Sequence, residues 1–234
     1  MIQFDSDKFY WHRYVDFYED KCFSRINPRH ILEFGVLRGE SIRYLNMRFP
    51  SAEIIGVDKD PVSIDCPKHG NISYIECNQN DRDAIKRILF APFMFDLIID
   101  DGSHNPLHQV TCLCESVYRM GSGSYYIVED IHTNLNVSGS LLHFLLMLEQ
   151  HQALKKHISD ENIKKFSETN VISEKDMRIL QDRIKSVQIF HRTSLPLKCW
   201  SCPSSEYNYL ALTCSCGLPL YQQDDSMSAL LELN

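Results

Sequence analysis

The chain has 234 residues, of which 44% are hydrophobic and 24% are charged, and its formal net charge is −7 at pH 7. These values are typical of a globular protein with one α/β domain and a modest appendage. The acidic balance excludes a general binder of nucleic acid or anionic membranes. We expect no membrane association, because no apolar run approaches transmembrane length and the first residues lack a signal-peptide pattern.

The chain contains nine cysteines, a high number for its length. They are scattered and odd in number, unlike the disulfide framework of a secreted protein. Free thiols in a reducing compartment are the simpler interpretation, and we therefore expect a cytoplasmic protein.

Hydrophobic periodicity predicts alternating strands and helices up to about residue 135. An amphipathic, aromatic-rich helix is expected over residues 7–25, ahead of the first strand. Gly121-Ser122-Gly123 is expected to be a tight turn into the fifth strand. The predicted strands are 30–34, 53–57, 72–77, 95–100 and 124–128, and the helices that follow the first, third and fourth are 40–48, 81–89 and 105–119. This alternation predicts a Rossmann-like, doubly wound, mostly parallel sheet with helices on both faces.

The pattern changes after residue 135. Residues 140–152 form a strongly apolar predicted helix, and residues 155–182 are expected to be an exposed helical stretch or a mobile loop. Residues 186–190 and 195–197 suggest closing strands. We expect a first domain over residues 1–198 and a cysteine-rich extension over residues 199–234.

Two predicted strands end in pairs of carboxylates. Asp100 and Asp101 follow one apolar run, with His104 three residues further on, and Glu129 and Asp130 follow the next. Ligands of open α/β sheets bind beyond the carboxyl ends of the strands, so these side chains are expected to share a cleft. Such carboxylates suit Mg²⁺, and an imidazole beside them is a candidate base. In isolation, an Asp-Gly-Ser-His run is often just a helix-capping turn.

A glycine turn follows the first predicted strand. It reads Glu33-Phe34-Gly35, with the next glycine at Gly39, and the second strand ends at Asp58. A glycine turn lets a cofactor approach the backbone, and an acid after the next strand suits a ribose diol. The glycine spacing differs from a dinucleotide fingerprint, which argues against NAD and for S-adenosylmethionine.

Together these motifs resemble class I S-adenosylmethionine-dependent methyltransferases. More narrowly, the chain is similar to the metal-dependent macrolide sugar O-methyltransferases of the mycinamicin and macrocin type and to their cephalosporin-hydroxylase-like relatives. The resemblance covers about Asp5 to Lys198. The matching segments are Asp7-Lys8 with His12 and Tyr14, Leu32 to Val36, Gly56-Val57-Asp58, Asn78 to Asp81, Asp100 to His104, and Val128-Glu129-Asp130.

The resemblance implies a class I methyltransferase fold with an N-terminal helical lid and an antiparallel closing strand. It implies His104 as the general base, Asp58 as the ribose-binding acid and Asp100 as a contact of the cofactor's amino group. It assigns Mg²⁺ or Mn²⁺ to Asp101, Glu129 and Asp130, the methionine end of the cofactor to Glu33, Phe34, Gly35 and Ser41, and the adenine to Asn78 and Gln79. The lid would bring His12 and Tyr14 near the cofactor, and His132 would line the acceptor site. The chain departs from the commoner pattern at Phe34 and at Cys77-Asn78.

The family pattern leaves Cys199, Cys202, Cys214 and Cys216 unexplained. A CxxC and a CxC pair could hold a tetrahedral, structural Zn²⁺. Free thiols in a short hairpin are the alternative, and the spacing alone does not decide between them.

The leading hypothesis is metal-assisted O-methylation of a sugar hydroxyl on a small molecule or a glycan. A phenolic acceptor is the second, although phenols need less help from a histidine base. A non-catalytic cofactor-binding scaffold is the third, and the cluster of like charges argues against it. An iron hydroxylase would need two histidines and one carboxylate, and here the acids outnumber the histidines. The resembled enzymes are often oligomeric, so a homo-oligomer is a further expectation.

Overall fold

The computed structural model describes residues 4–60, 65–221 and 225–234. Its centre is a seven-stranded sheet in the order β3-β2-β1-β4-β5-β9-β6. Strands β1 to β5 pair in parallel, and β9 pairs antiparallel with both β5 and β6. The strands are β1 (His30–Phe34), β2 (Glu53–Asp58), β3 (Ile72–Glu76), β4 (Phe95–Asp100), β5 (Met120–Val128), β6 (Ile184–His191) and β9 (Met227–Leu233). The predicted mostly parallel sheet with an antiparallel closing strand is confirmed.

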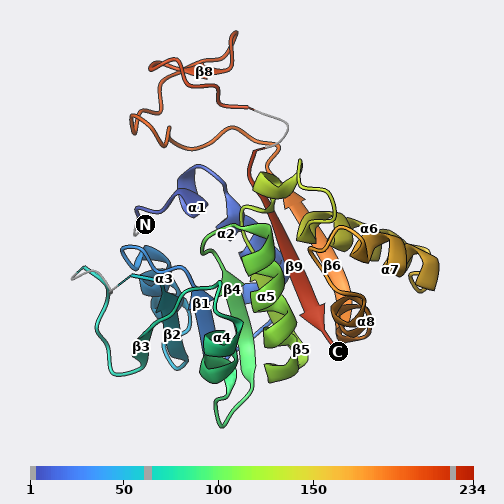
Figure 1. Ribbon diagram of the computed structural model, residues 1–234. Coiled ribbons are helices and arrows are strands. Elements are labelled where there is room, and N and C mark those ends of the chain that lie inside the picture. The colour runs from blue at the N-terminus through green and yellow to red at the C-terminus, as the bar shows by residue number, and fades with distance from the viewer. Residues whose placement is uncertain (1–3, 61–64, 222–224) are drawn as a thin grey trace.

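Helices cover both faces of the sheet (Figure 1). One face packs against α2 (Tyr14–Tyr18), the π-helical turn η1 (Glu19–Phe23) and α3 (Glu40–Arg48). The other packs against α4 (Arg82–Leu89), α5 (Pro106–Ser116), α6 (Leu141–Ala153), α7 (Asp160–Ser167) and α8 (Glu174–Arg183). Successive strand residues alternate between the two cores: Leu97 and Ile99 face the first, whereas Ile98 faces the second. The central strands are therefore buried on both faces.

The N-terminal segment differs from the single helix expected over residues 7–25. It consists of α1 (Asp7–Tyr10), α2 and η1. Arg13, which lies between α1 and α2, has a φ of 61°. This left-handed conformation interrupts a right-handed helix. The break turns the chain so that residues on both sides of Arg13 reach the same end of the sheet.

Two further segments are more ordered than predicted. Residues 121–123 lie inside β5 rather than in a turn before it. The pairing of β5 with β4 jumps from Met120 to Tyr125 while β4 advances from Phe95 to Leu97, so the glycines accommodate a bulge. For residues 155–182, the helical alternative is confirmed by α7 and α8, but these helices bury Ile163, Met177 and Leu180 against the core.

The sheet closes differently from the prediction. The predicted strand 186–190 is present as β6, whereas residues 195–197 form no strand and β9 completes the sheet between β5 and β6. Its residues Ala229 to Leu231 are apolar and buried. The cysteine-rich extension expected over 199–234 therefore returns to the sheet. Its first part, with the short strands β7 (Tyr207–Asn208) and β8 (Thr213–Cys214), projects beyond the carboxyl ends of the parallel strands (Figure 1). We refer to residues 195–221 as the cysteine-rich segment.

Candidate active site

The register of the sheet brings the ends of three strands to one level. Phe34 of β1 pairs with Asp100 of β4, which pairs with Val128 of β5. The backbone N–H of Asp101 donates to the Phe34 carbonyl at 2.9 Å, and that of Glu129 donates to the Asp100 carbonyl at 2.9 Å. The Phe34 side chain is buried in the core. The backbone pairing of Phe34 helps to set the point at which β4 ends and the acidic residues begin.

Asp101, His104 and Asp130 come together beyond these strand ends. One ligand atom from each lies within 4.8 Å of the others. The Nε2 atom of His104 is 3.5 Å from Asp130 Oδ2. His104 and Asp130 both have left-handed backbones, with φ of 54° and 53°. Such conformations are costly for non-glycine residues and persist where the surroundings impose them, often at functional sites.

Lys8 lies among three carboxylates of the site. Its Nζ is 3.0 Å from Asp101 Oδ2 and 3.2 Å from one oxygen of each of Glu33 and Glu129. It also donates to Ser41 Oγ at 2.9 Å, and Ser41 donates to Glu33. Burial lowers the pKa of the Lys8 ammonium, but the surrounding negative charges outweigh burial and raise the pKa well above its usual value. A buried charge requires such partners.

Glu129 contacts Lys8 rather than joining the trio of Asp101, His104 and Asp130. Burial raises the pKa of the Glu129 carboxyl well above its usual value, and repulsion from Asp101 adds to the effect. Burial likewise raises the pKa of Glu33, against the opposing influence of Lys8. Lys8 thus provides one positive charge against the three carboxylates that it contacts, so the site carries a surplus of negative charge that favours a cation.

Aromatic and imidazole groups surround Asp130. The Tyr14 hydroxyl donates to Asp130 Oδ1 at 2.6 Å. His12 Nε2 and His132 Nδ1 lie 3.9 Å and 3.8 Å from the same oxygen. The placement of His12 and Tyr14 by the N-terminal segment agrees with their expected position near the site. Sequence patterns gave no role to Lys8, because α1 is too short for its periodicity to show which side chain faces the site.

The glycine turn after β1 is held against the acidic strand ends. Gly35 has a φ of 89°, and a Cβ atom there would lie 2.1 Å from the Asp101 carbonyl oxygen. Only glycine fits this contact. Asp58 Oδ2 accepts from the backbone N–H groups of Val36 and Leu37 at 2.8 Å and 3.1 Å. Burial alone would raise the pKa of Asp58, but these donors lower it. Asp58 therefore holds the backbone of the glycine turn in place through two hydrogen bonds.

Gln79 and Asp100 form an internal network. Gln79 Nε2 donates to Asp100 Oδ1 at 2.7 Å, and Gln79 Oε1 accepts from the Ser103 N–H at 2.8 Å. The Tyr126 hydroxyl donates to Asp100 Oδ2 at 3.2 Å. Burial raises the pKa of Asp100 to about 6. The expected roles of Gln79 at the adenine and of Asp100 at the cofactor's amino group stay predictions. Asn78 is exposed.

The four cysteines of the cysteine-rich segment also come together. The sulfur atoms of Cys199, Cys202, Cys214 and Cys216 lie within 4.8 Å of one another. All nine cysteines lie in the described part of the chain, and no disulfide joins them there.

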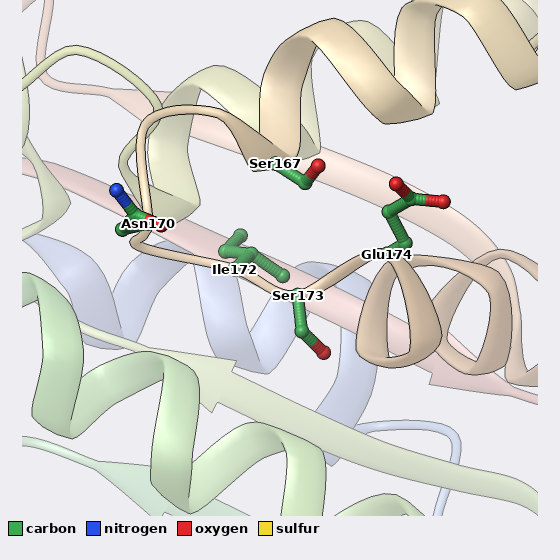
Figure 2. A pocket seen from close by; sticks show the side chains of 5 residues that line it. All are labelled: Ser167, Asn170, Ile172, Ser173 and Glu174. Atoms are coloured by element: carbon green, nitrogen blue, oxygen red, sulfur yellow. The ribbon is translucent and has the colours of Figure 1, made fainter.

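A separate surface hollow of about 330 Å³ lies along the connection between α7 and α8. Figure 2 shows its lining residues, which include Asn170, Ser173 and Glu174. Ser173 caps the start of α8 by accepting from the Asp176 N–H at 3.1 Å. The hollow thus consists of helix-end groups, and none of its lining residues belongs to the acidic site.

The strand order, the glycine turn after β1 and the acids after β2, β4 and β5 define the class I S-adenosylmethionine-dependent methyltransferase fold. A solved structure of this fold covers 94% of the chain with a TM-score of 0.64 and 20% identity: the MycE methyltransferase of the mycinamycin biosynthetic pathway in complex with Mg, SAH and mycinamycin VI. The chain matches 48% of that structure. The expected fold is therefore confirmed.

Curated sequences point to a narrower resemblance. Over 142 residues, the chain is 32% identical to 8-demethyl-8-(2-methoxy-alpha-L-rhamnosyl)-tetracenomycin-C 3'-O-methyltransferase from Streptomyces olivaceus, covering 55% of this chain and 35% of that protein. Over 111 residues, it is 33% identical to mycinamicin VI 2''-O-methyltransferase from Micromonospora griseorubida, covering 44% of this chain and 27% of the relative. The chain thus spans about a third of the length of these relatives. No family model matches it. The chain resembles sugar O-methyltransferases of natural-product pathways.

Proposed function

We propose that this protein is an S-adenosylmethionine-dependent O-methyltransferase that uses a divalent metal and acts on a sugar hydroxyl. The observation that carries the proposal is the meeting of Asp101, His104 and Asp130 beyond β4 and β5, beside the glycine turn and Asp58. This arrangement combines a cofactor turn, hard oxygen ligands and a base in one place. The named relatives, which methylate sugars, support the same reaction class.

The turn around Gly35 fits S-adenosylmethionine. Glu33 Oε2 is buried and has no hydrogen-bond partner among the described residues. A buried carboxylate oxygen without a donor is costly, and the amino group of the methionine moiety would satisfy it. Ser41 and Lys8 would fix this carboxylate, and Asp58 would accept from the ribose. The cofactor would supply the electrophilic methyl group.

The donor set beyond β4 and β5 fits Mg²⁺ or Mn²⁺. Asp101 and Asp130 would provide oxygen ligands, and Glu129 is the proposed third. Glu129 would have to share its carboxylate with Lys8, which is 3.2 Å away. A bound divalent cation would act as a Lewis acid toward an acceptor hydroxyl.

His104 is the proposed general base. Its Nε2 faces Asp130 and the space beside Asp101, whereas its Nδ1 is buried. The neutral tautomer with the proton on Nδ1 presents the Nε2 lone pair to a hydroxyl in that space. Once Nε2 has taken the proton, the carboxylate of Asp130, which accepts from the Tyr14 hydroxyl, would stabilise the imidazolium. An aliphatic hydroxyl needs such a base, because its pKa lies far above 7.

We propose two accompanying features. The four cysteines of the cysteine-rich segment bind a structural zinc ion. The protein is cytoplasmic, a proposal supported by its nine cysteines, which form no disulfide among the described residues. Within the described part of the chain, every helix is too short or too polar to cross a bilayer.

The test is methyl transfer to a panel of rhamnosylated and other deoxysugar-bearing natural products, with Mg²⁺ and with EDTA, followed by mass spectrometry. We expect one added methyl group on the sugar, with Mg²⁺ only. Simple catechols in the same panel test the phenolic alternative. Calorimetry with S-adenosylhomocysteine is the control for cofactor binding. If the protein does not bind S-adenosylhomocysteine in either condition, the proposal is wrong.

A further inference from the structure

The four sulfur atoms of the cysteine-rich segment have the spacing of a metal tetrahedron. Zinc–sulfur bonds of about 2.3 Å place the ligands of a tetrahedral site about 3.8 Å apart. The Cys199 and Cys216 sulfurs are 3.8 Å apart, and those of Cys202 and Cys214 are 3.4 Å apart. Both distances far exceed a disulfide bond of about 2.05 Å. The arrangement fits four thiolate ligands around one Zn²⁺.

Two tight turns supply these sulfurs in pairs. In the first, the Cys199 N–H donates to the Ser204 carbonyl at 2.8 Å. In the second, the Gly217 N–H donates to the Cys214 carbonyl at 2.8 Å, and Gly217 has a φ of 88°. The strands β7 and β8, two residues each, join the turns. So little regular structure cannot fold without an additional constraint, and a bound metal provides one.

The apolar side of the cysteine cluster packs on the N-terminal segment. The small core of the cysteine-rich segment contains Trp11, Cys199, Cys214 and Leu220, all buried. The Leu197 N–H donates to the Tyr10 carbonyl at 2.7 Å, and the Lys198 ammonium lies 4.1 Å from the centre of the Tyr10 ring. Trp11 and Tyr10 are therefore fixed by the residues that surround the sulfurs.

The same short segment reaches the acidic site. Lys8 precedes Tyr10 by two residues and contacts three carboxylates, and Tyr14 follows Trp11 by three and donates to Asp130. The helix α1 has four residues and is too short to be stable alone. Its position depends on contacts at both ends, of which the cysteine-rich segment provides one.

We infer that zinc bound by Cys199, Cys202, Cys214 and Cys216 holds residues 7–14 over the active site, so that Lys8 and Tyr14 are positioned by a metal that takes no part in the reaction. Binding the ion releases the thiol protons to solvent. The description of residues 7–14 as a cover of the active site rests on the proposed function, whereas the zinc site does not.

The first measurement is metal content of the full chain, purified without chelators, by mass spectrometry. We expect one zinc per chain in the wild type and in Ser201→Ala, which changes an exposed residue between two ligands. We expect none in Cys202→Ser/Cys216→Ser. In the wild type, exchange of zinc for Co²⁺ should produce the intense absorption of a tetrahedral cobalt thiolate. A zinc-free wild type with two disulfides would overturn the inference.

The second measurement is hydrogen exchange of the amides in residues 7–14. We expect about tenfold faster exchange in the zinc-free double variant, because local opening becomes easier. In Trp11→Ala, which keeps all four thiols, we expect the same acceleration with zinc still bound. Unchanged exchange in the double variant would contradict the positioning role while leaving the proposed methyl transfer untouched. Neither measurement requires activity, so failure here and failure of the proposed function are distinguishable.

Discussion

The acidic site and the cysteine-rich segment achieve their geometry in opposite ways. In the acidic site, parallel strands in register deliver Asp101 and Asp130 from the rigid core. In the cysteine-rich segment, two turns and a two-residue ladder carry the four sulfurs. The first region is positioned by two large apolar cores, one on each face of the sheet, whereas the second is positioned by a core of four buried residues.

This difference predicts how each region should respond when its proposed metal is removed. A site built on a sheet keeps its shape when its ligand leaves, because the strands are held by backbone bonds and packing. A site built on turns loses its shape when its metal leaves. Loss of Mg²⁺ should therefore change chemistry without changing structure, and loss of zinc should change structure first.

The largest effect is expected for His104→Asn. Asparagine tolerates the left-handed backbone at this position, so the change removes the base with little strain. We expect kcat to fall by about 10²–10⁴-fold with S-adenosylhomocysteine affinity unchanged, measured by steady-state kinetics and calorimetry. His108→Gln, four residues away on α5, is the control and should retain activity. Loss of cofactor binding in His104→Asn would remove its assignment as base.

The next effect concerns the buried ammonium. Lys8→Met leaves Glu33, Asp101 and Glu129 without their positive partner. We expect the free energy of unfolding to fall by about 3–5 kcal/mol, because breaking a buried ion pair leaves unpaired charge. Millimolar Mg²⁺ should restore part of the loss. Denaturation with and without Mg²⁺ measures both effects.

Lys21→Met is the matched surface control for that change. Its partner Asp20 is exposed, so we expect almost no change in stability. Equal stability of Lys8→Met and wild type would show that the central contacts of Lys8 contribute nothing.

Asp101→Asn tests whether the proposed Mg²⁺ site and the proposed zinc site are independent. We expect the Mg²⁺ concentration for half-maximal activity to rise about 10–100-fold, because one oxygen ligand loses its charge. The zinc content should stay at one per chain. Cys214→Ser should lose zinc and, because it keeps every proposed Mg²⁺ ligand, show a smaller rise in its Mg²⁺ requirement than Asp101→Asn. An unchanged Mg²⁺ requirement in Asp101→Asn would exclude this residue as a ligand.

The smallest effect depends on pH. Burial alone would raise the pKa of Asp225, but a hydrogen bond from Ser226 and the ion pair with Arg192, aided by His12, lower it. The Asp225 oxygen lies 2.6 Å from the buried Arg192 guanidinium, which stacks on Trp11. Because the folded-state pKa is the lower one, this stabilisation is present above the unfolded-state value near 4 and is lost as pH falls.

Asp225→Asn should therefore lower the free energy of unfolding by about 1–2 kcal/mol at pH 7. The difference from wild type should shrink below pH 4, as chemical denaturation at several pH values would show. Asp160→Asn removes a surface pair with Arg178 and should cost less at every pH. A difference that persists at pH 2 would mean that charge is not the cause.

The strands of the parallel sheet were predictable because each is a short apolar run between turn residues. The meeting of Asp101, His104 and Asp130 followed from one rule about strand ends. The four cysteines gave the ligands of a possible metal site, but spacing alone could not show that the sulfurs meet.

The remaining features depend on contacts between residues far apart in sequence. Lys8 and Glu129 are 121 residues apart, and no local pattern links them. The turn-like glycines at 121–123 belong to a bulge that only the pairing with β4 reveals. Strand β9 was not predicted, because its apolar run lies outside the strand–helix alternation and its partners β5 and β6 are distant in sequence.

The position of β9 has a consequence for synthesis of the protein. β9 lies between β5 and β6 but follows both in the chain. During synthesis, the edges of β5 and β6 that pair with β9 stay unpaired until residues 227–233 emerge from the ribosome. Unpaired strand edges favour wrong pairing. The cysteine-rich segment is made during that interval. The cysteine-rich segment can thus bind the proposed zinc before the sheet is complete, and pairing of β9 with β5 and β6 follows that step.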